Sequence, residues 1–536
     1  MVAPALVEPL PQRLRAMFEA CEREFPIDRW YVGGIAVWPL IRVDLYLRWV
    51  QSYSATGSAV AALPAAGDAG RLQRAGLIAA RALASVSAML LRPLPPPAVK
   101  AAVLLLSDGV SFVNLASRRF EKFCDPVASI YAEAGIDCLK LDPAARDGQS
   151  AGGWFGLDAS LEMALRRSRL RRIAAPLLEG YEAFAEVARR SCGVCPMTRR
   201  DVARSAGIVE AYAAVFERLL DSSGARLAFQ VSYYSQVGFA FNLACRRAGI
   251  RVVDLQHGVA GDSNPAYGYW NRRPARGFEL LPTHFWCWSN AECDAIESWA
   301  SGSSGDSGAL RGCNLLPAFF EAGRIAQDPA DTEELERLLA NGSAGNPRVL
   351  LTLQPNYMTD PVWRDRVNAL IDDSAARLTW WVRPHPMMTG AADEIARALP
   401  RVARAALPAA TRLPLHMLLA NADVHATHSS ATVREADELG VPSAVLSETG
   451  AGFFAASVAA GSAVRILLDG DRSAAAAQVA ALAGRPHFTA ERTRAACALI
   501  ESARSVLLDL MGAEAAGGTA AALADGDASV EESRDG

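Results

Sequence analysis

The sequence predicts an α/β protein built from two doubly wound, Rossmann-like domains that follow a helical N-terminal extension. Short apolar runs resembling buried strands alternate with helical stretches, which is the pattern of parallel sheets covered by helices. The alternation occurs twice, on either side of the segment SGSSGDSG at 301–308. A chain of 536 residues is also too long for one hydrophobic core, so more than one domain is expected.

The composition is that of a globular protein and argues against several classes of function. Hydrophobic residues make up 51% of the chain and charged residues 21%, within the usual range for globular proteins. The formal net charge of −4 predicts no general attraction to nucleic acid, so no nucleic-acid partner is expected. Lysine occurs only at Lys100, Lys122 and Lys140, and arginine supplies the other positive charges.

The sequence also carries signals about cellular location. Residues 1–18 contain prolines and charges where a signal peptide needs an apolar core. No uninterrupted apolar run of about 18 residues occurs, so no transmembrane helix is expected. Ten cysteines at irregular spacing fit a reducing compartment better than a disulfide framework. We expect a cytoplasmic protein, and the basic stretch at 166–172 leaves peripheral contact with the inner membrane open.

The first half of the chain is expected to hold the extension and one domain. Residues 1–97 should form a helical N-terminal extension and linker that ends in the polyproline segment RPLPPP. The first Rossmann-like domain is then expected over 98–300. Its apolar runs end in small or polar residues, as in AAVLLLSDG, which is typical of strands that open into ligand-facing loops. The predicted strands lie at 101–109, 138–142, 227–234, 251–258 and 284–289.

The second Rossmann-like domain is expected over 309–511. Helical segments such as PVWRDRVNALIDDSAA separate its apolar runs, which again indicates a parallel sheet. Residues 512–536 are small and acidic and lack periodicity, so they are expected to be a disordered tail. The predicted strands lie at 348–354, 378–386, 422–430, 442–447 and 464–469.

Three of the seven histidines follow predicted strands. His257 ends a strand of the first domain, and His385 and His428 end strands of the second. Ligands of open parallel α/β sheets bind beyond the carboxyl ends of the strands. The shared position therefore favours a functional role over three unrelated structural histidines.

A candidate anion site surrounds two of these histidines. Prolines hold the arginine and histidine of WVRPHP in a rigid loop. Hydroxyls in THSSATVREADELG precede a predicted helix, where they either cap the helix or bind phosphate together with free amides. With the WVRPHP loop beside them, phosphate binding is the favoured interpretation. Glu435, one helical turn later, would reach a ribose or sugar hydroxyl. The candidate phosphate-binding residues are Arg383, His385, Ser429, Ser430 and Thr432.

These motifs, in this order, resemble those of bacterial GT-B glycosyltransferases. The order is QHG at 256–258, the HP loop at 385–386, and a T-x-S-S segment followed by E-A-x-x-L-G-x-P at 427–442. The resemblance extends over about residues 100–480 and includes FCDPVASIYAEAGIDCLKLD and LRGCNLLPAFF. Capsule and lipopolysaccharide enzymes of the Kdo-transferase-like and polysialyltransferase-like groups are the most similar. Teichoic-acid glycerophosphotransferases share a similar arrangement of HG and HP.

The resemblance implies two domains facing a cleft, with the nucleotide-sugar donor held mainly by the second domain and the acceptor mainly by the first. It implies that His385, Ser429 and Ser430 hold the nucleotide phosphates and that Glu435 contacts the nucleotide or the donor sugar. It also implies a metal-independent reaction with no cofactor beyond the nucleotide-sugar substrate. The sequence has no DxD motif in a convincing strand-end loop, in agreement with this expectation.

Two residues compete for the role of catalytic base. His257 has an ordinary pKa that suits proton transfer at neutral pH, or it could bind a donor carboxylate or phosphate. Asp108, in the loop after the first strand, is the rival, although SDG is also an ordinary turn sequence. The basic loop NRRPARG follows the QHG segment and would meet an anionic substrate or remain solvated. The residues predicted to line the cleft are Gln256, Gly258, Arg272, Arg273 and His428.

The sequence is thus interpreted as a glycosyltransferase that moves a sugar from a nucleotide-activated donor to a surface glycan or glycosylated acceptor. A CMP-linked acidic sugar fits the HP loop and the arginines, while UDP- and GDP-linked donors stay open. The alternatives with the same fold are a glycerophosphotransferase, a nucleotide-sugar epimerase and a non-catalytic scaffold. The glycines usual in the acidic, Gly-rich segment of such epimerases are missing from THSSATVREADELG, which ranks the epimerase below the transferases.

Overall fold

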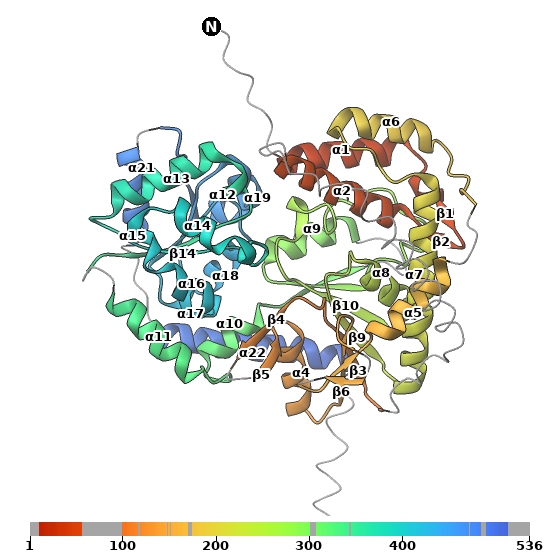
Figure 1. Ribbon diagram of the computed structural model, residues 1–536. Helices are drawn as coiled ribbons and strands as arrows, with labels where there is room; N and C mark the ends of the chain where they lie inside the picture. Colours follow the sequence, from red (N-terminus) through yellow and green to blue (C-terminus); the bar gives the residue numbers. More distant parts are fainter. Residues whose placement is uncertain are drawn as a thin grey trace, which may run out of the picture.

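The computed structural model describes most of the chain as two α/β lobes side by side (Figure 1). The predicted polyproline boundary, part of the basic stretch at 166–172, His487 and the predicted tail beyond Gly512 lie outside the described residues. No helix within the described ranges is long and apolar enough to cross a membrane. The described residues are 10–55, 99–115, 118–146, 148–150, 152–169, 174–300, 307–341, 345–470, 472–483 and 489–512.

The first domain is organised around an eight-stranded sheet with the order β12-β11-β10-β9-β3-β6-β8-β7. All neighbouring strands are parallel except β7 and β8. After β3, the strands up to β8 are added on one side of it. The strands from β9 to β12 are then added on its other side. The direction of winding therefore changes between β3 and β9. The strands are β3 (Val103–Leu106), β6 (Cys138–Asp142), β7 (Gly148–Ser150), β8 (Trp154–Gly156), β9 (Leu227–Val231), β10 (Arg251–Leu255), β11 (His284–Cys287) and β12 (Gly308–Arg311).

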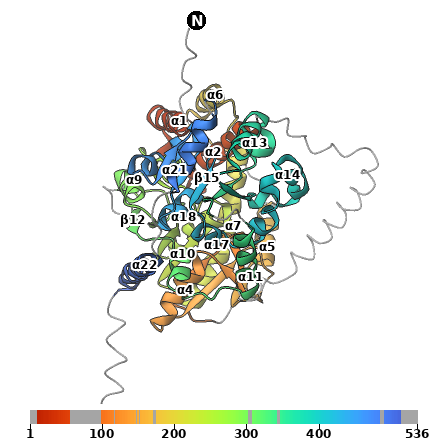
Figure 2. The ribbon, with the colours of Figure 1, turned by 90° about the vertical axis from the view of Figure 1, so that its left-hand side faces the viewer.

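The second domain contains a five-stranded, wholly parallel sheet with the order β14-β13-β15-β16-β17. Its winding direction changes between β13 and β15, and Figure 2, which looks onto this domain, shows β15 near the centre. The prediction of two Rossmann-like doubly wound domains is confirmed. The strands are β13 (Arg348–Thr352), β14 (Thr379–Arg383), β15 (Val424–Thr427), β16 (Ser443–Val445) and β17 (Ala463–Arg465).

Helices cover both sheets, because each sheet buries apolar side chains on both faces. Those that follow the first-domain strands are α4 (Cys124–Glu133), α5 (Asp158–Arg169), α6 (Tyr181–Cys192), α7 (Arg199–Ser223), α8 (Gln236–Arg247), η2 (Gly261–Ser263), α9 (Asn290–Ala300) and α10 (Leu315–Glu321). Those of the second part of the chain are α11 (Pro329–Ala340), α12 (Asn356–Thr359), α13 (Pro361–Ser374), η3 (Pro386–Ala391), α14 (Ala392–Ala398), α15 (Arg401–Arg404), α16 (Leu407–Arg412), α17 (Leu415–Ala420), α18 (Thr432–Glu438), α19 (Glu448–Phe453), α20 (Ala455–Ala460), α21 (Arg472–Leu482) and α22 (Thr489–Met511).

The N-terminal segment is helical, as expected, but it belongs to the core of the first domain. It consists of α1 (Leu10–Glu24), η1 (Ile27–Arg29), the short pair β1 (Tyr31–Val32) and β2 (Ile35–Ala36), and α2 (Trp38–Ala55). Its apolar side chains join one hydrophobic cluster with α6, α7 and α8. A buried ion pair between Glu22 and Arg42 attaches it further, because Arg42 donates to the carbonyl of Gly268 at 2.7 Å and Glu22 accepts from the amide of Asn271 at 2.7 Å.

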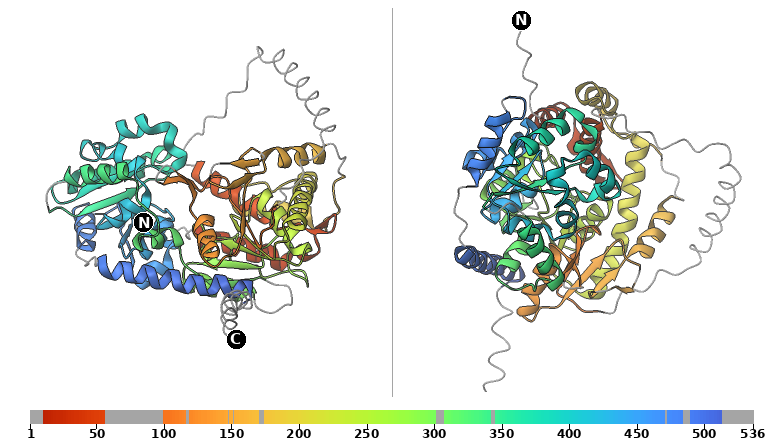
Figure 3. Two further views of the ribbon diagram at one scale, coloured as in Figure 1. Left: turned by 90° about the horizontal axis from the view of Figure 1, so that it is seen from below. Right: turned by 60° about the vertical axis from the view of Figure 1, so that its left-hand side comes forward.

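The domain boundaries differ from the expected 98–300 and 309–511 in two ways. The strand β12, at 308–311, extends the first sheet instead of opening the second domain. The last helix, α22, returns to the first domain, where Leu507 and its apolar neighbours pack against strands β3 and β9 and helix α4. The carbonyl of Leu507 accepts a hydrogen bond from the Tyr131 hydroxyl at 2.7 Å. Figure 3 (left) shows α22 running along one side of both lobes. Local periodicity predicts this helix but does not indicate which sheet it covers.

A hairpin interrupts the first βα connection. The strands β4 (Phe112–Leu115) and β5 (Arg118–Glu121) pair with each other between β3 and α4. Such connections usually have only a few residues, so this hairpin is an insertion at the carboxyl edge of the first sheet. The insertion points toward the second domain (Figure 1).

Because α22 contributes to the first-domain core, truncating its buried face should destabilise that domain. We expect Leu507→Ala to lower the free energy of unfolding by about 2–5 kcal/mol, because its side chain is fully buried. Ser505→Ala, on the exposed face of the same helix, should change it by less than about 0.5 kcal/mol. Urea unfolding of both variants measures the difference, and equal effects would contradict the packing of α22.

Candidate functional site

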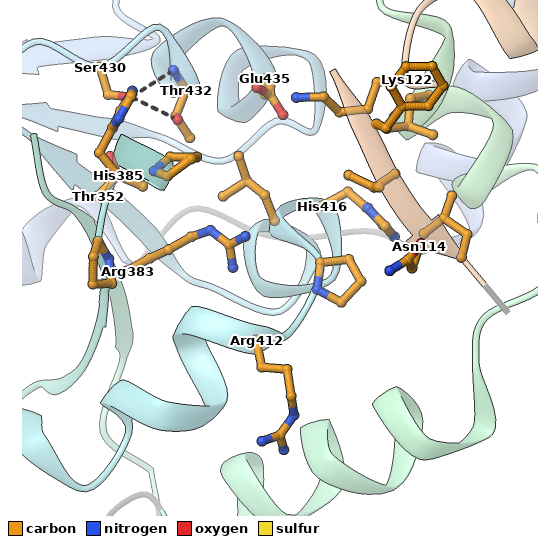
Figure 4. A pocket seen from close by; sticks show the side chains of 18 of the residues that line it. Asn114, Lys122, Thr352, Arg383, His385, Arg412, His416, Ser430, Thr432 and Glu435 are labelled. Atoms are coloured by element: carbon orange, nitrogen blue, oxygen red, sulfur yellow. Dashed lines mark hydrogen bonds between the residues drawn. The ribbon is translucent and has the colours of Figure 1, made fainter. Parts of the chain in front are cut away.

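A cavity of about 800 Å³ lies between the two domains (Figure 4). Its second-domain wall carries Thr352, at the end of β13, with side chains from the loop after β14 and from the start of α18. Its first-domain wall is the inserted hairpin, including Asn114, and Lys122 just after it. The second-domain wall coincides with the change of winding between β13 and β15. This is where open α/β sheets bind ligands, because the diverging loops leave a crevice there.

Hydroxyl groups line the pocket at the start of α18. The Ser430 hydroxyl lies 2.9 Å from that of Thr432 and accepts from the Thr432 amide at 3.3 Å. The Ser430 amide donates to the hydroxyl of Thr427 at 3.2 Å. Ser429 is placed differently, because its amide and hydroxyl both donate to Gln354 Oε1 at 2.9 Å. Ser430 and Thr432 line the pocket, whereas Ser429 does not. Because α18 has only seven residues, the hydroxyls rather than a helix dipole would supply this anion site.

The loop after β14 places a guanidinium and an imidazole on the same wall. Arg383 Nη1 donates to the carbonyls of Ala410, at 2.7 Å, and Leu413, which hold the guanidinium at the pocket. Burial lowers the pKa of Arg383, and the Glu435 carboxylate opposes that effect. Burial also lowers the pKa of His385, so its imidazole is neutral at pH 7 before a ligand binds.

Glu435 faces the same pocket from the first turn of α18 (Figure 4). Burial raises the pKa of its carboxyl group, while the charges of Lys122 and Arg383 lower it. Among the described residues, no hydrogen bond or ion pair occupies this carboxylate. A ligand hydroxyl or amine placed there would therefore find an available acceptor.

His257 lies next to the pocket without lining it. Its Nδ1 is 3.3 Å from the carbonyl of Leu255, so Nδ1 carries the proton and donates. Its Nε2 then accepts from the Tyr234 hydroxyl at 3.0 Å. Burial lowers the pKa of His257, an effect opposed by the charge of Asp108 and reinforced by that of Lys122. His257 is therefore neutral at pH 7, and Tyr234 must release Nε2 before this nitrogen can accept another proton.

Asp108 serves as a turn-forming residue in this structure. Its Oδ1 accepts from the amides of Val110 at 2.9 Å and Ser111 at 2.8 Å, and its Oδ2 accepts from the Ser111 hydroxyl at 2.7 Å. Both carboxylate oxygens are thus engaged in the loop that leads into the inserted hairpin. Of the two candidate bases, His257 has the geometry that fits the role better.

A buried polar chain links this loop of the first domain to α18 of the second. Gln256 Nε2 donates to the carbonyl of Gly258 and to Glu292 Oε1, both at 2.8 Å. The same carboxylate oxygen lies 3.3 Å from Arg434 Nε, on α18. Gly258 itself lies against Ala431 of the second domain. Gln256 therefore connects the domains at a buried position. The prediction that it lines the cleft is wrong, because its side chain is not exposed in the pocket.

Three other residues predicted to line the cleft lie elsewhere. Arg272 is paired with Asp28 and donates to the carbonyl of Phe25 at 3.0 Å, because the N-terminal segment covers the NRRPARG loop. Arg273 stacks over the Trp299 ring, 5.7 Å from its centroid. His428 packs edge-on against Trp363 behind the pocket wall. Tertiary contacts that are distant in sequence decide all three positions.

The pocket also contains residues that sequence reasoning missed. They include Lys122 and Asn114 from the hairpin region and Arg412 and His416 from the segment around α17. Lys122 could have been noticed in the sequence, because a lysine is unusual in a chain whose positive charges are nearly all arginines. The others follow no motif, and only folding brings them to the pocket.

No group of three or more potential metal ligands lies close together in the part of the chain that the structure describes. The expected metal independence therefore stays a prediction.

Comparisons with known proteins find no matching family model and no matching curated protein. Similar solved structures include two UDP-GlcNAc 2-epimerases. That from Neisseria meningitidis is 10% identical, covering 75% of this chain and 98% of that one, with a TM-score of 0.43. That from Methanocaldococcus jannaschii is 10% identical, covering 72% and 93%, also with a TM-score of 0.43. The spinosyn rhamnosyltransferase SpnG is 14% identical, covering 76% and 99%, with a TM-score of 0.37. Likenesses at this level give no evidence about activity.

The buried ion pair between the domains should be sensitive to loss of one partner. We expect Arg434→Met to lower the free energy of unfolding by about 3–5 kcal/mol, because it leaves the charge of Glu292 buried and unpaired. Arg465→Met, which breaks an exposed pair with Glu448, should cost no more than about 1 kcal/mol. Urea unfolding compares the two variants, and a similar small cost for both would show that the ion pair does not stabilise the interface.

His425, in the strand β15 that leads to the predicted phosphate motif, should make stability depend on pH. Burial lowers its pKa to about 3, and its ring nitrogens lie 2.9 Å from the Thr352 hydroxyl and 3.0 Å from the Ser443 hydroxyl. Only the unfolded chain binds a proton here between pH 6.5 and 4, so stability is complete above pH 6.5 and falls as the pH falls. At pH 5.5 the loss is about 1.4 kcal/mol relative to pH 7.5.

Replacing the imidazole should remove this part of the pH dependence. We expect the difference in unfolding free energy between pH 7.5 and 5.5 to shrink by about 1.4 kcal/mol in His425→Gln. Ser443→Ala is the matched control, because it removes a partner of His425 but keeps the buried imidazole, so its pH dependence should equal that of the wild type. An unchanged pH dependence in His425→Gln would contradict the assignment.

Proposed function

We propose that this protein is a glycosyltransferase that moves a sugar from a nucleotide-activated donor to a surface glycan or a glycosylated acceptor. The observation that carries the proposal is the convergence of Arg383, His385, Ser430 and Thr432 on one wall of the interdomain pocket, at the change of winding between β13 and β15. Guanidinium, imidazole and hydroxyl groups are donors that suit phosphate oxygens. The opposite wall belongs to the first domain, which leaves room for a second substrate.

The chemistry assigns a separate task to each part of the pocket. The nucleotide phosphate would accept hydrogen bonds from Arg383 and His385, which stabilise the negative charge that develops as the bond between the sugar carbon and the phosphate oxygen breaks. Glu435 would accept a hydrogen bond from a hydroxyl of the donor. His257 Nε2 would take the proton of the acceptor hydroxyl as its oxygen bonds to the sugar carbon, after Tyr234 has turned away.

The donor is the first part of the proposal to test. A CMP-linked acidic sugar remains the favoured candidate, because the guanidinium of Arg383 matches an anionic group, and UDP- and GDP-linked sugars are the competitors. A capsule or lipopolysaccharide intermediate at the cytoplasmic face of the inner membrane would be the acceptor.

Nucleotide binding can be measured without knowing the acceptor. We expect CMP, CDP, UDP or GDP at millimolar concentration to raise the thermal midpoint of the wild type by about 2 °C or more, because a ligand that binds only the folded state stabilises it. His385→Ala should abolish this rise. His284→Ala is the control, because His284 begins β11 at the amino edge of the first sheet, so its response should equal that of the wild type.

The outcomes separate the alternatives. If no nucleotide shifts the wild type, the donor site is wrong and a scaffold role becomes the better explanation. If one nucleotide binds, its sugar derivative is incubated with and without a glycan acceptor. A transferase releases the nucleotide rapidly only with acceptor, an epimerase interconverts the donor alone, and a glycerophosphotransferase requires a CDP-linked polyol instead.

A further inference from the structure

Lys122 is the cation that the first domain contributes to the pocket. It is one of three lysines in the chain, and the other two have visible partners: Lys140 pairs with Asp125 at 2.8 Å, and Lys100 donates to the carbonyl of Ser222 at 3.2 Å. Lys122 Nζ forms no hydrogen bond or ion pair with any residue that the structure describes. Its Nζ makes a cation–π contact with the Phe123 ring, 5.4 Å from the ring centroid.

The backbone of Lys122 is held firmly where the inserted hairpin ends. Its amide donates to the carbonyl of Ser111 at 3.1 Å and so closes the base of the hairpin. On the next residue, the amide of Phe123 donates to Glu121 Oε2 at 2.9 Å, and the Phe123 ring stacks on Trp288. The side chain therefore leaves a rigid base and extends into the cavity, where its reach is set by its own length.

The surroundings of Lys122 place it between the proposed phosphate end and the proposed base. Figure 4 shows it extending toward Glu435 from the opposite wall. The two charges influence each other, yet their atoms lie beyond ion-pair distance, since no contact within 4.0 Å is found. Lys122 also acts electrostatically on His257. A half-buried ammonium in this position has a Coulombic attraction to Glu435 but no hydrogen-bond acceptor among the residues that the structure describes.

We propose that Lys122 is an oxyanion-binding residue that the first domain extends across the pocket, so that an anionic group of the ligand is held between the two domains. The ligand group is a phosphate or carboxylate oxygen, which would accept charge-assisted hydrogen bonds from Nζ. This inference rests on the proposed function for its biological meaning, but the oxyanion site itself can be tested without any nucleotide sugar.

The scarcity of lysine makes a direct chemical test feasible. Pyridoxal 5′-phosphate carries an aldehyde that forms an imine with an amine, and borohydride reduces this imine to a stable label, whereas pyridoxal carries the same aldehyde without the phosphate. We expect Lys122 to be labelled about tenfold faster by the phosphorylated reagent than by pyridoxal, because a charge-assisted hydrogen bond from Arg383 or His385 would hold the reagent's phosphate in the pocket while Lys122 forms the imine. Lys100, exposed and outside the pocket, is the internal control and should show little preference. Peptide mass spectrometry quantifies each site.

Protection and substitution distinguish the two sources of the oxyanion. Protection of Lys122 by inorganic pyrophosphate but not by malonate identifies a phosphate site, and the reverse identifies a carboxylate site. For the nucleotide that binds best, we expect Lys122→Met to raise the Kd of the matching sugar nucleotide about tenfold, Lys122→Arg to restore part of the affinity, and Lys100→Met to change nothing.

Two results would overturn the inference. One is equal labelling of Lys122 by the two reagents without protection by either anion. The other is a Kd for Lys122→Met within about twofold of the wild type for every ligand whose binding His385→Ala abolishes. The second result would leave the proposed function intact. Conversely, selective labelling of Lys122 in a protein that binds no nucleotide would uphold the oxyanion site and reject the proposed function.

Discussion

The buried ion pair between Glu292 and Arg434 is the constraint on which the geometry of the pocket depends. Two charges held away from water stay stable only if each has partners, so α9 of the first domain and α18 of the second must keep their relative position. The same carboxylate holds Gln256, which fixes the loop that presents His257. The hydroxyls at the start of α18 and the imidazole at the end of β10 are therefore positioned by one polar chain.

Burial is the main cause of the neutral state of the imidazoles in and beside the pocket, and neighbouring cations add to its effect. Burial lowers the pKa of His385, and burial together with the charge of Arg383 lowers that of His416 to about 3. A neutral imidazole offers one donor and one acceptor, and it gains charge only when an anion arrives to compensate it. The charge that is permanently available comes from Arg383, anchored by carbonyls, and from Lys122 on the opposite wall.

The inserted hairpin explains how a fold with separate domains can form one site. Its strands leave the first sheet at the carboxyl edge, where Asp108 shapes the turn, and they return at Lys122. The insertion thus extends across the pocket without disturbing the parallel order of the sheet. The helix α22, which follows the second domain in the chain, packs on the first domain and so connects the two domains in a different place.

The sequence alone determined the two parallel sheets, the strand ends that carry His257 and His385, and the motif that supplies Ser430, Thr432 and Glu435. Each of these depends on local periodicity or on residues that are neighbours in the chain, and both are legible without a structure. Only the tertiary structure decided which motif residues face the ligand. Arg272 was turned away by the N-terminal segment, and α22 returned to the first domain, because contacts between distant segments determine direction and partner. The local sequence pattern predicts whether a residue is buried or exposed, but the packing of distant segments determines which residues it contacts.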